Sequence, residues 1–175
     1  MTPTQALFQA VSTKGTLASD IRSLIRQGAN VNGRTQEGLT PLVGAALFLN
    51  RECVQILIDA GAVVDVRPNG DYLDGKTALL AAVSNTINDS GVIQVLIDAG
   101  ADVNAADTFG RTALMYAAAT SNLNLVETLV REGANINQRD KYGWSALGLA
   151  KQNNAKPSII RFLADMGAKL SEKGR

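Results

Sequence analysis

A Gly-Ala pair that returns at nearly constant spacing limits the possible folds of this chain more than any other feature. The pair occurs five times, and its successive spacings are 33, 39, 33 and 34 residues. The five glycines are Gly28, Gly61, Gly100, Gly133 and Gly167. A fixed period in this range is typical of a repeat protein, in which one supersecondary unit is copied and stacked. The chain of 175 residues is therefore expected to form five similar repeats that share a continuous core.

The repeat is clearest in residues 107–140, which read DTFGRTALMYAAATSNLNLVETLVREGANINQRD. Residues 112–119 form an Ala-rich run, and residues 122–131 place apolar side chains at helical spacing. Gly133 follows where a helix needs a left-handed cap. This pattern predicts a helix, a turn, a second helix and a loop. Hydroxyl residues that open the first helix recur at Thr40, Thr77, Thr112 and Ser145.

This repeat resembles the ankyrin repeat. FGRTALMYAA is similar to the family's G-x-T-P-L-H-x-A-A, and REGANINQRD is similar to x-x-G-A-D-V-N-A-x-D. The resemblance covers about Thr4 to Leu170 and implies an all-α ankyrin-repeat solenoid of five stacked helix-turn-helix repeats with hairpin-like finger loops. It implies a single domain over residues 1–175, whose first and last repeats are caps. The repeats are expected at about residues 4–35, 36–70, 71–107, 108–140 and 141–175.

The third repeat and the missing histidines depart from the family pattern. Two extra residues fall between the predicted helices of the third repeat, in SNTINDSG, and four more lengthen its loop VRPNGDYLDG. The chain contains no histidine. The hydrogen bonds that the family's histidine makes between neighbouring loops are expected to be missing or supplied by other groups. The positions concerned hold Val43, Leu80, Met115 and Gly148.

Charge and hydropathy exclude two classes of partner. The 17 Lys and Arg residues are interspersed with 16 Asp and Glu residues, which offers little to the phosphates of a nucleic acid. No segment reaches the roughly 18 apolar residues of a membrane span, and MTPTQALFQAVS does not resemble a signal peptide. We expect a cytoplasmic protein, or a periplasmic or secreted one if a signal peptide before Met1 has been removed.

The residue types needed for catalysis are largely missing. Without histidine there is no Ser-His-Asp or Cys-His arrangement and no histidine metal ligand. The single cysteine, Cys53, takes the place of an aliphatic residue and is expected to be buried and inert. Asp71 and Asp74 lack the ligand spacing of an EF-hand, so their loop is interpreted as a turn. The sequence predicts a non-enzyme with no catalytic residues, no cofactor and no metal.

Alignment of the repeats places eight side chains on the finger loops and at the ends of the first helices. Five of the chain's eight aromatic residues are among them, and large aromatic side chains are enriched at binding hot spots. The alternative is that these rings fold back and cover their own hairpins. The predicted partner-binding residues are Phe48, Tyr72, Leu73, Lys76, Phe109, Arg111, Tyr142 and Trp144.

Two classes of function are compatible with these observations. The first is a non-catalytic scaffold that grips a folded partner protein through its concave face, as an adaptor or as an inhibitor. If the repeats stand alone without an attached domain, the inhibitor is expected to be of the immunity type. The second is a structural or assembly subunit that uses the groove for self-association. The first class predicts a monomer when no partner is bound.

Overall fold

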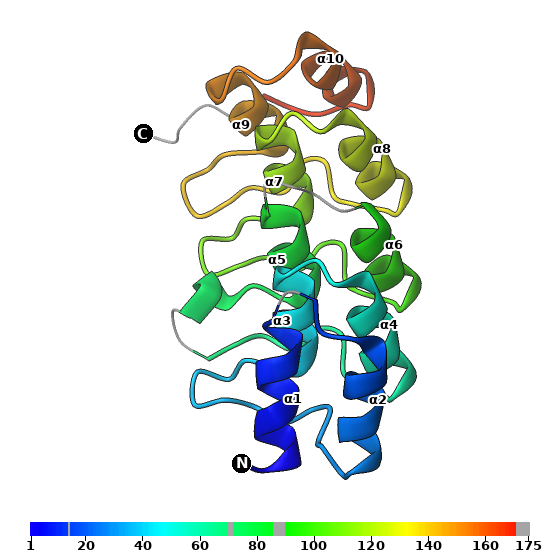
Figure 1. Cartoon of the computed structure of the whole chain (residues 1–175). Coiled ribbons are helices and arrows are strands. Elements are labelled where there is room, and N and C mark those ends of the chain that lie inside the picture. The colour runs from blue at the N-terminus through cyan, green and yellow to red at the C-terminus, as the bar shows by residue number, and fades with distance from the viewer. Residues whose placement is uncertain (14, 70–71, 86–89, 171–175) are drawn as a thin grey trace. The chain divides into compact units, whose positions relative to one another are not determined.

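The computed structural model describes residues 1–13, 15–69, 72–85 and 90–170. The chain divides into two compact parts, Met1–Asp102 and Val103–Arg175, which we call the N-terminal unit and the C-terminal unit. The described residues form ten α-helices and one short 3₁₀ helix (Figure 1). The N-terminal unit holds α1 (Pro3–Val11), α2 (Ala18–Arg26), α3 (Pro41–Leu47), α4 (Arg51–Asp59), η1 (Tyr72–Gly75), α5 (Ala78–Ser84) and α6 (Ser90–Asp98). The C-terminal unit holds α7 (Ala113–Ala119), α8 (Leu123–Arg131), α9 (Ala146–Gln152) and α10 (Pro157–Asp165).

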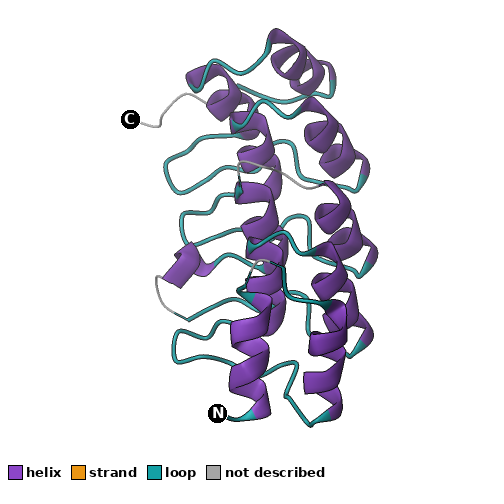
Figure 2. Ribbon diagram, viewed as in Figure 1, coloured by secondary structure: helices purple, strands orange, loops and turns teal. Residues whose placement is uncertain are grey.

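Within each unit the helices form an inner and an outer layer. In the N-terminal unit the inner helices α1, α3 and α5 pack in sequence, and so do the outer helices α2, α4 and α6. In the C-terminal unit α7 packs on α9, and α8 packs on α10. Figure 2 shows long loops projecting on the side of the inner helices. We call these the finger loops, and each precedes an inner helix.

Hydroxyl side chains begin four of the inner helices, as predicted. The Oγ1 atoms of Thr40, Thr77 and Thr112 each accept a hydrogen bond of 3.4 Å from the backbone three residues on. Ser145 does the same for Gly148 at 3.3 Å. Such caps satisfy backbone N–H groups that have no partner in the first helical turn. Each of these four finger loops therefore ends at a defined residue.

A glycine ends each of five outer helices. Gly133 has φ +86. This left-handed conformation is unfavourable for any residue that carries a Cβ atom. The turn lets the N–H of Ala134 donate to the carbonyl of Leu129 over 2.9 Å. The left-handed cap predicted at this position is confirmed.

The two helix layers bury different surfaces. The short inner helices are buried nearly all round, since every residue of α5 from Ala78 to Val83 is buried. Alanine allows this because its small side chain lets neighbouring helices approach closely. The outer helices are amphipathic, and α8 buries Leu125, Val126 and Leu129 on one face. Leu114 of α7 has no exposed surface, so it belongs to the core.

Asparagine side chains join the starts of successive finger loops, just after the outer helices. Asn104 donates from Nδ2 to the carbonyl of Gly133 over 3.1 Å, and its Oδ1 accepts from the N–H of Asn135 over 2.7 Å. Asn32 makes the same pair of bonds to Gly61 and Val63. These amides supply inter-loop hydrogen bonds in a chain that has no histidine.

The prediction of an all-α repeat fold is confirmed by these helix pairs. Parts of the two predicted insertions, residues 70–71 and 86–89, lie outside the described residues. The single domain over 1–175 and its repeat boundaries stay predictions. None of the described helices has the length and hydropathy required to cross a bilayer.

Candidate functional site

The finger loop before α7 is built around the buried carboxylate of Asp107. Its Oδ1 accepts hydrogen bonds from the backbone N–H groups of Phe109 and Arg111, over 2.8 and 2.9 Å. Its Oδ2 accepts a 2.6 Å hydrogen bond from the hydroxyl of Tyr116 on α7. Hydrogen bonds to a charged acceptor are stronger than neutral ones. The carboxylate therefore ties the tip of the loop to the inner helix behind it.

The finger loop before α9 repeats half of this arrangement. Oδ1 of Asp140 accepts from the N–H groups of Tyr142 and Trp144, over 2.9 and 2.8 Å. Its Oδ2 lies 3.6 Å from Nε of Arg111, and neither atom has a hydrogen-bond partner among the described residues. The contact is therefore an ion pair without a hydrogen bond, and it joins the two finger loops of the C-terminal unit.

A backbone hydrogen bond also joins these two finger loops. The N–H of Lys141 donates to the carbonyl of Phe109 over 2.8 Å. The loops approach closely at Gly110, where a Cβ atom would lie 3.1 Å from the nitrogen of Lys141. Gly110 also has φ +78, so both its conformation and the available space favour glycine. The two finger tips are thus held side by side by their main chains.

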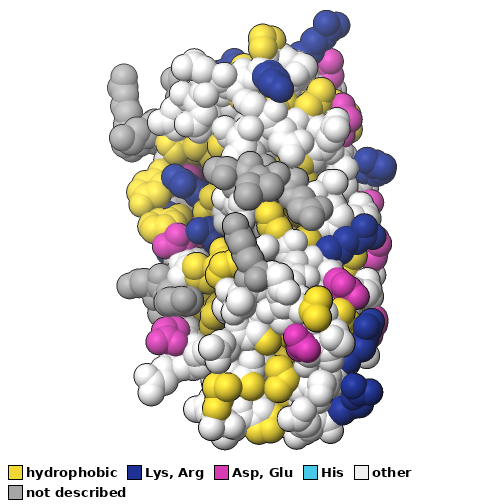
Figure 3. All heavy atoms as spheres, in the orientation of Figure 1, with side chains coloured by type: hydrophobic (Ala, Val, Ile, Leu, Met, Phe, Trp, Pro, Cys, Tyr) yellow, Lys and Arg dark blue, Asp and Glu magenta, His cyan; other side chains and the backbone are white. Residues whose placement is uncertain are grey.

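Two aromatic rings lie together on these finger tips. The rings of Phe109 and Tyr142 are stacked, with centroids 6.4 Å apart and planes inclined by 24°. Phe109 is 36% exposed and Tyr142 is 51% exposed. Figure 3 shows hydrophobic side chains gathered at its left edge, over the finger loops before α7 and α9. The repeat alignment predicted that these residues share a face, and the structure brings them into contact.

The other predicted binding residues occupy three different settings. Trp144 is half-buried on the finger loop before α9. Phe48 is exposed at the end of α3. Leu73 and Lys76 are half-buried near η1, and Nζ of Lys76 lies 3.0 Å from a carboxylate oxygen of Asp74. The side chain of Tyr72 lies outside the described residues. The role of these residues in partner binding stays a prediction.

A cavity of about 290 Å³ adjoins Arg111 along the inner helices α7 and α9. Arg111 was predicted from the sequence as a binding residue. The cavity, and the place of Tyr116 in its lining, were not predicted. The repeat alignment does distinguish Tyr116, because the equivalent residue 33 positions later is Leu149, whose side chain cannot donate a hydrogen bond. Its lining includes Arg111, Met115, Tyr116, Leu149, Gln152 and Asn153.

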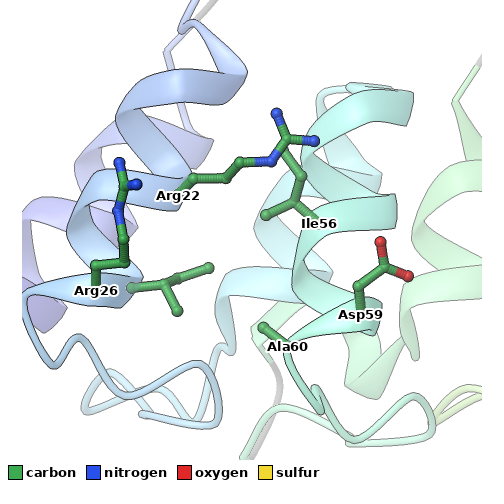
Figure 4. A pocket seen from close by; sticks show the side chains of 6 residues that line it. Arg22, Arg26, Ile56, Asp59 and Ala60 are labelled. Carbon is green, nitrogen blue, oxygen red and sulfur yellow. The ribbon is translucent and has the colours of Figure 1, made fainter.

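A second cavity, of about 330 Å³, lies between the outer helices α2 and α4 of the N-terminal unit. Figure 4 shows the side chain of Arg22 extending from α2 toward Ile56 on α4. Arg22, Arg26 and Asp59 are at least partly exposed, so this is an open groove between two outer helices. It contains none of the predicted binding residues.

Cys53 is fully buried in α4, as predicted. Burial raises the pKa of its thiol, and the neighbouring charge of Glu52 raises it further. A thiol with a raised pKa is a poor nucleophile because little thiolate forms near neutral pH. Among the described residues, no three or more His, Cys, Asp and Glu side chains lie together in a group that could hold a metal ion.

Comparison with known proteins shows a similarity over nearly the whole chain. A family model described as ankyrin repeats (3 copies) matches residues 7–107 and 87–173. Neurogenic locus notch homolog protein 1 of Xenopus laevis is 36% identical over 108 residues, which cover 61% of this chain and 4% of that protein. Human ankyrin repeat and SOCS box protein 6 is 35% identical over 118 residues, which cover 67% of this chain and 27% of that protein. The chain therefore spans only a small share of the length of these relatives.

Proposed function

Because the chain belongs to the ankyrin-repeat family, we propose that it is a non-catalytic scaffold that grips a folded partner protein through its finger loops and inner helices. Ankyrin repeats generally serve as scaffolds for protein–protein interaction. The observation that carries this proposal is the pair of exposed, stacked rings of Phe109 and Tyr142 on neighbouring finger tips. Large aromatic side chains that remain exposed are typical anchors of a protein interface.

The rigid support of these rings favours a binding role. Asp107 and Asp140 brace the two loops from within, and the bond from Lys141 to Phe109 fixes their spacing. A surface that is ordered before binding loses little conformational entropy when a partner docks. The finger tips therefore offer apolar area at a low cost in side-chain and loop ordering.

Two roles follow from one binding face. As an adaptor, the chain tethers its partner, and as an inhibitor of the immunity type it covers the partner's active site. An inhibitor needs no chemistry of its own, which agrees with a buried Cys53 and a chain without histidine. In this proposal the unbound chain is a cytoplasmic monomer that needs no cofactor and binds neither nucleic acid nor a membrane.

Alanine substitution of the rings tests the proposal once a partner has been captured from the native host. Phe109→Ala and Tyr142→Ala should each weaken binding by about 2 kcal/mol, or roughly 30-fold, because each removes an anchor. Both rings are partly exposed, so the midpoint of chemical unfolding should change little. Titration calorimetry gives the affinity, and denaturation gives the stability.

Exposed glutamines on the outer helices provide matched controls. Gln55→Ala and Gln94→Ala should change the affinity by less than about 0.5 kcal/mol. If these variants lose binding and the ring variants keep it, the partner binds another face and the proposal is wrong. A dimer in light scattering, broken by Phe109→Ala, would instead support self-association through the same rings.

A further inference from the structure

We infer that the cavity beside Arg111 receives a carboxylate side chain, an aspartate or a glutamate, from the partner protein. This inference rests on the proposed function and narrows it to a class of partner surface. It is carried by the chemistry of the cavity lining, by the unused hydrogen-bonding edge of Arg111, and by the distribution of charge along the chain.

The guanidinium of Arg111 faces Asp140 with its Nε edge, and the edge formed by its two terminal nitrogens is available to a ligand. Its buried Nε atom faces Oδ2 of Asp140 at 3.6 Å, while the side chain as a whole is 38% exposed. No described residue accepts a hydrogen bond from its two terminal nitrogens. A guanidinium whose outer edge is available can bind a carboxylate through two parallel hydrogen bonds. Asp140 therefore orients Arg111 without occupying that edge.

Most other polar groups around the cavity already have a protein partner. The hydroxyl of Tyr116 donates to Asp107, and Nδ2 of Asn153 donates to the carbonyl of Leu149 over 3.1 Å. Gln152 is exposed at the end of α9, where its amide can donate to a bound ligand. The lining therefore offers one cation and one amide donor to an incoming group.

The apolar part of the lining favours a carboxylate on an aliphatic stem. Met115 and Leu149 lie at the buried base of the cavity and offer it a small apolar surface, while most of the exposed lining is polar. The methylene groups of an aspartate or glutamate can cover such a surface while the carboxylate reaches Arg111. A nucleic acid would require several cations along a phosphate backbone, whereas the lining holds one.

The charge of the two units differs in sign. Residues 103–175 contain ten Lys and Arg and six Asp and Glu residues, a formal charge of +4. Residues 1–102 contain seven Lys and Arg and ten Asp and Glu residues, a formal charge of −3. Asp107 and Asp140 are also buried, so two of the carboxylates of the C-terminal unit are withdrawn from its surface. This balance favours the approach of an acidic surface to the C-terminal unit.

The test uses two small probes, N-acetyl-glutamate amide and N-acetyl-glutamine amide, with the full chain at low salt. We expect the glutamate probe to produce saturable NMR shifts at the Nε–H of Arg111 and at the side-chain amide of Gln152. The glutamine probe has the same shape without the charge and should produce neither. Saturable shifts at both groups with the glutamate probe alone support the inference.

Gln152→Glu is the main variant because it leaves the ion pair between Arg111 and Asp140 intact. The new carboxylate should compete for Arg111 and weaken binding of the glutamate probe about tenfold or more. Asn124→Glu, on the exposed face of α8, adds the same charge away from the cavity and should change binding less than about twofold. Arg111→Lys keeps the charge but loses the planar fork, so it should also weaken binding.

Several results would overturn the inference. These are no saturable shift with the glutamate probe, equal shifts with both probes, or equal effects of Gln152→Glu and Asn124→Glu. Tighter binding of a single-stranded DNA oligonucleotide than of a glutamate-rich peptide, lost in Gln152→Glu, would assign the cavity to phosphate instead. A partner that loses affinity with Phe109→Ala but keeps it with Gln152→Glu would contradict this inference and leave the proposed function standing. Binding of the glutamate probe, together with partner binding that is insensitive to Phe109→Ala, would leave this inference standing and contradict the proposed function.

Discussion

Tyr116 donates a 2.6 Å hydrogen bond to the buried carboxylate of Asp107, and the next repeat replaces this bond with an ion pair. There the equivalent carboxylate of Asp140 lies 3.6 Å from Nε of Arg111, and Leu149 takes the position of Tyr116. One helix thus supports its finger loop through a neutral phenol. The finger loop before α9 is supported instead by Arg111 of the preceding finger loop. The two terminal nitrogens of Arg111 take no part in this ion pair.

Tyr116→Phe should lower the free energy of unfolding by about 1.5–3 kcal/mol. The substitution keeps the ring but removes a hydrogen bond to a buried carboxylate, which leaves one oxygen of Asp107 without that donor. Chemical denaturation measures the loss. Tyr142→Phe is the matched control, because the ring of Tyr142 is half exposed, and it should cost less than about 0.5 kcal/mol. Equal losses in the two variants would contradict the role of Tyr116.

Leu114→Ala should lower the free energy of unfolding by about 2–5 kcal/mol. Leu114 has no exposed surface, so its truncation removes buried methyl groups and leaves a cavity in α7. Urea denaturation followed by circular dichroism gives the value. A loss under about 1 kcal/mol would mean that the core around α7 relaxes around the missing side chain.

Gly110→Ala should destabilise the chain more than Gly133→Ala does. Both glycines have positive φ, so both variants have a similar cost of about 1–2 kcal/mol from the left-handed conformation. Only at Gly110 would the new methyl group also press on a backbone nitrogen, that of Lys141, at 3.1 Å. A methyl group added at Gly133 would meet no atom of another described residue within 4 Å, its chain neighbours aside. Faster amide exchange at Lys141 in Gly110→Ala alone would show that the bond between the fingers has weakened.

Cys53 should react slowly with a thiol reagent in the native chain and rapidly in denaturant. Burial both shields the thiol and raises its pKa, so little thiolate is available near neutral pH. Mass spectrometry after timed labelling follows the reaction. Cys53→Val should leave partner binding unchanged, whereas rapid native labelling would contradict the assignment of Cys53 to the core.

The helices and their ends could be predicted from the sequence because their causes are local. A threonine cap such as Thr112 and a left-handed glycine such as Gly133 act within a few residues of their own position. The burial of Leu114 followed from its place in a repeated helical pattern. Periodicity also placed Phe109 and Tyr142 at equivalent positions of adjacent repeats.

The support of the finger loops was not predicted because it depends on side chains that meet across the fold. Nothing near Asp140 in the sequence indicates that its carboxylate pairs with Arg111, which lies on another finger loop. The exposure of each ring depends on its rotamer and its neighbours, so the half-buried setting of Trp144 could not be predicted from its place on a finger loop. The cavity beside Arg111 likewise results from the packing of α7 against α9.

The bond from Lys141 to Phe109 has a consequence for the kinetics of any complex formed at these finger tips. Since the two rings already lie together in the unbound chain, docking requires no slow rearrangement of the loops. Encounter should then proceed at the ordinary rate for two rigid surfaces. Substitutions of the rings should shorten the lifetime of the complex, while the rate at which it forms stays nearly constant.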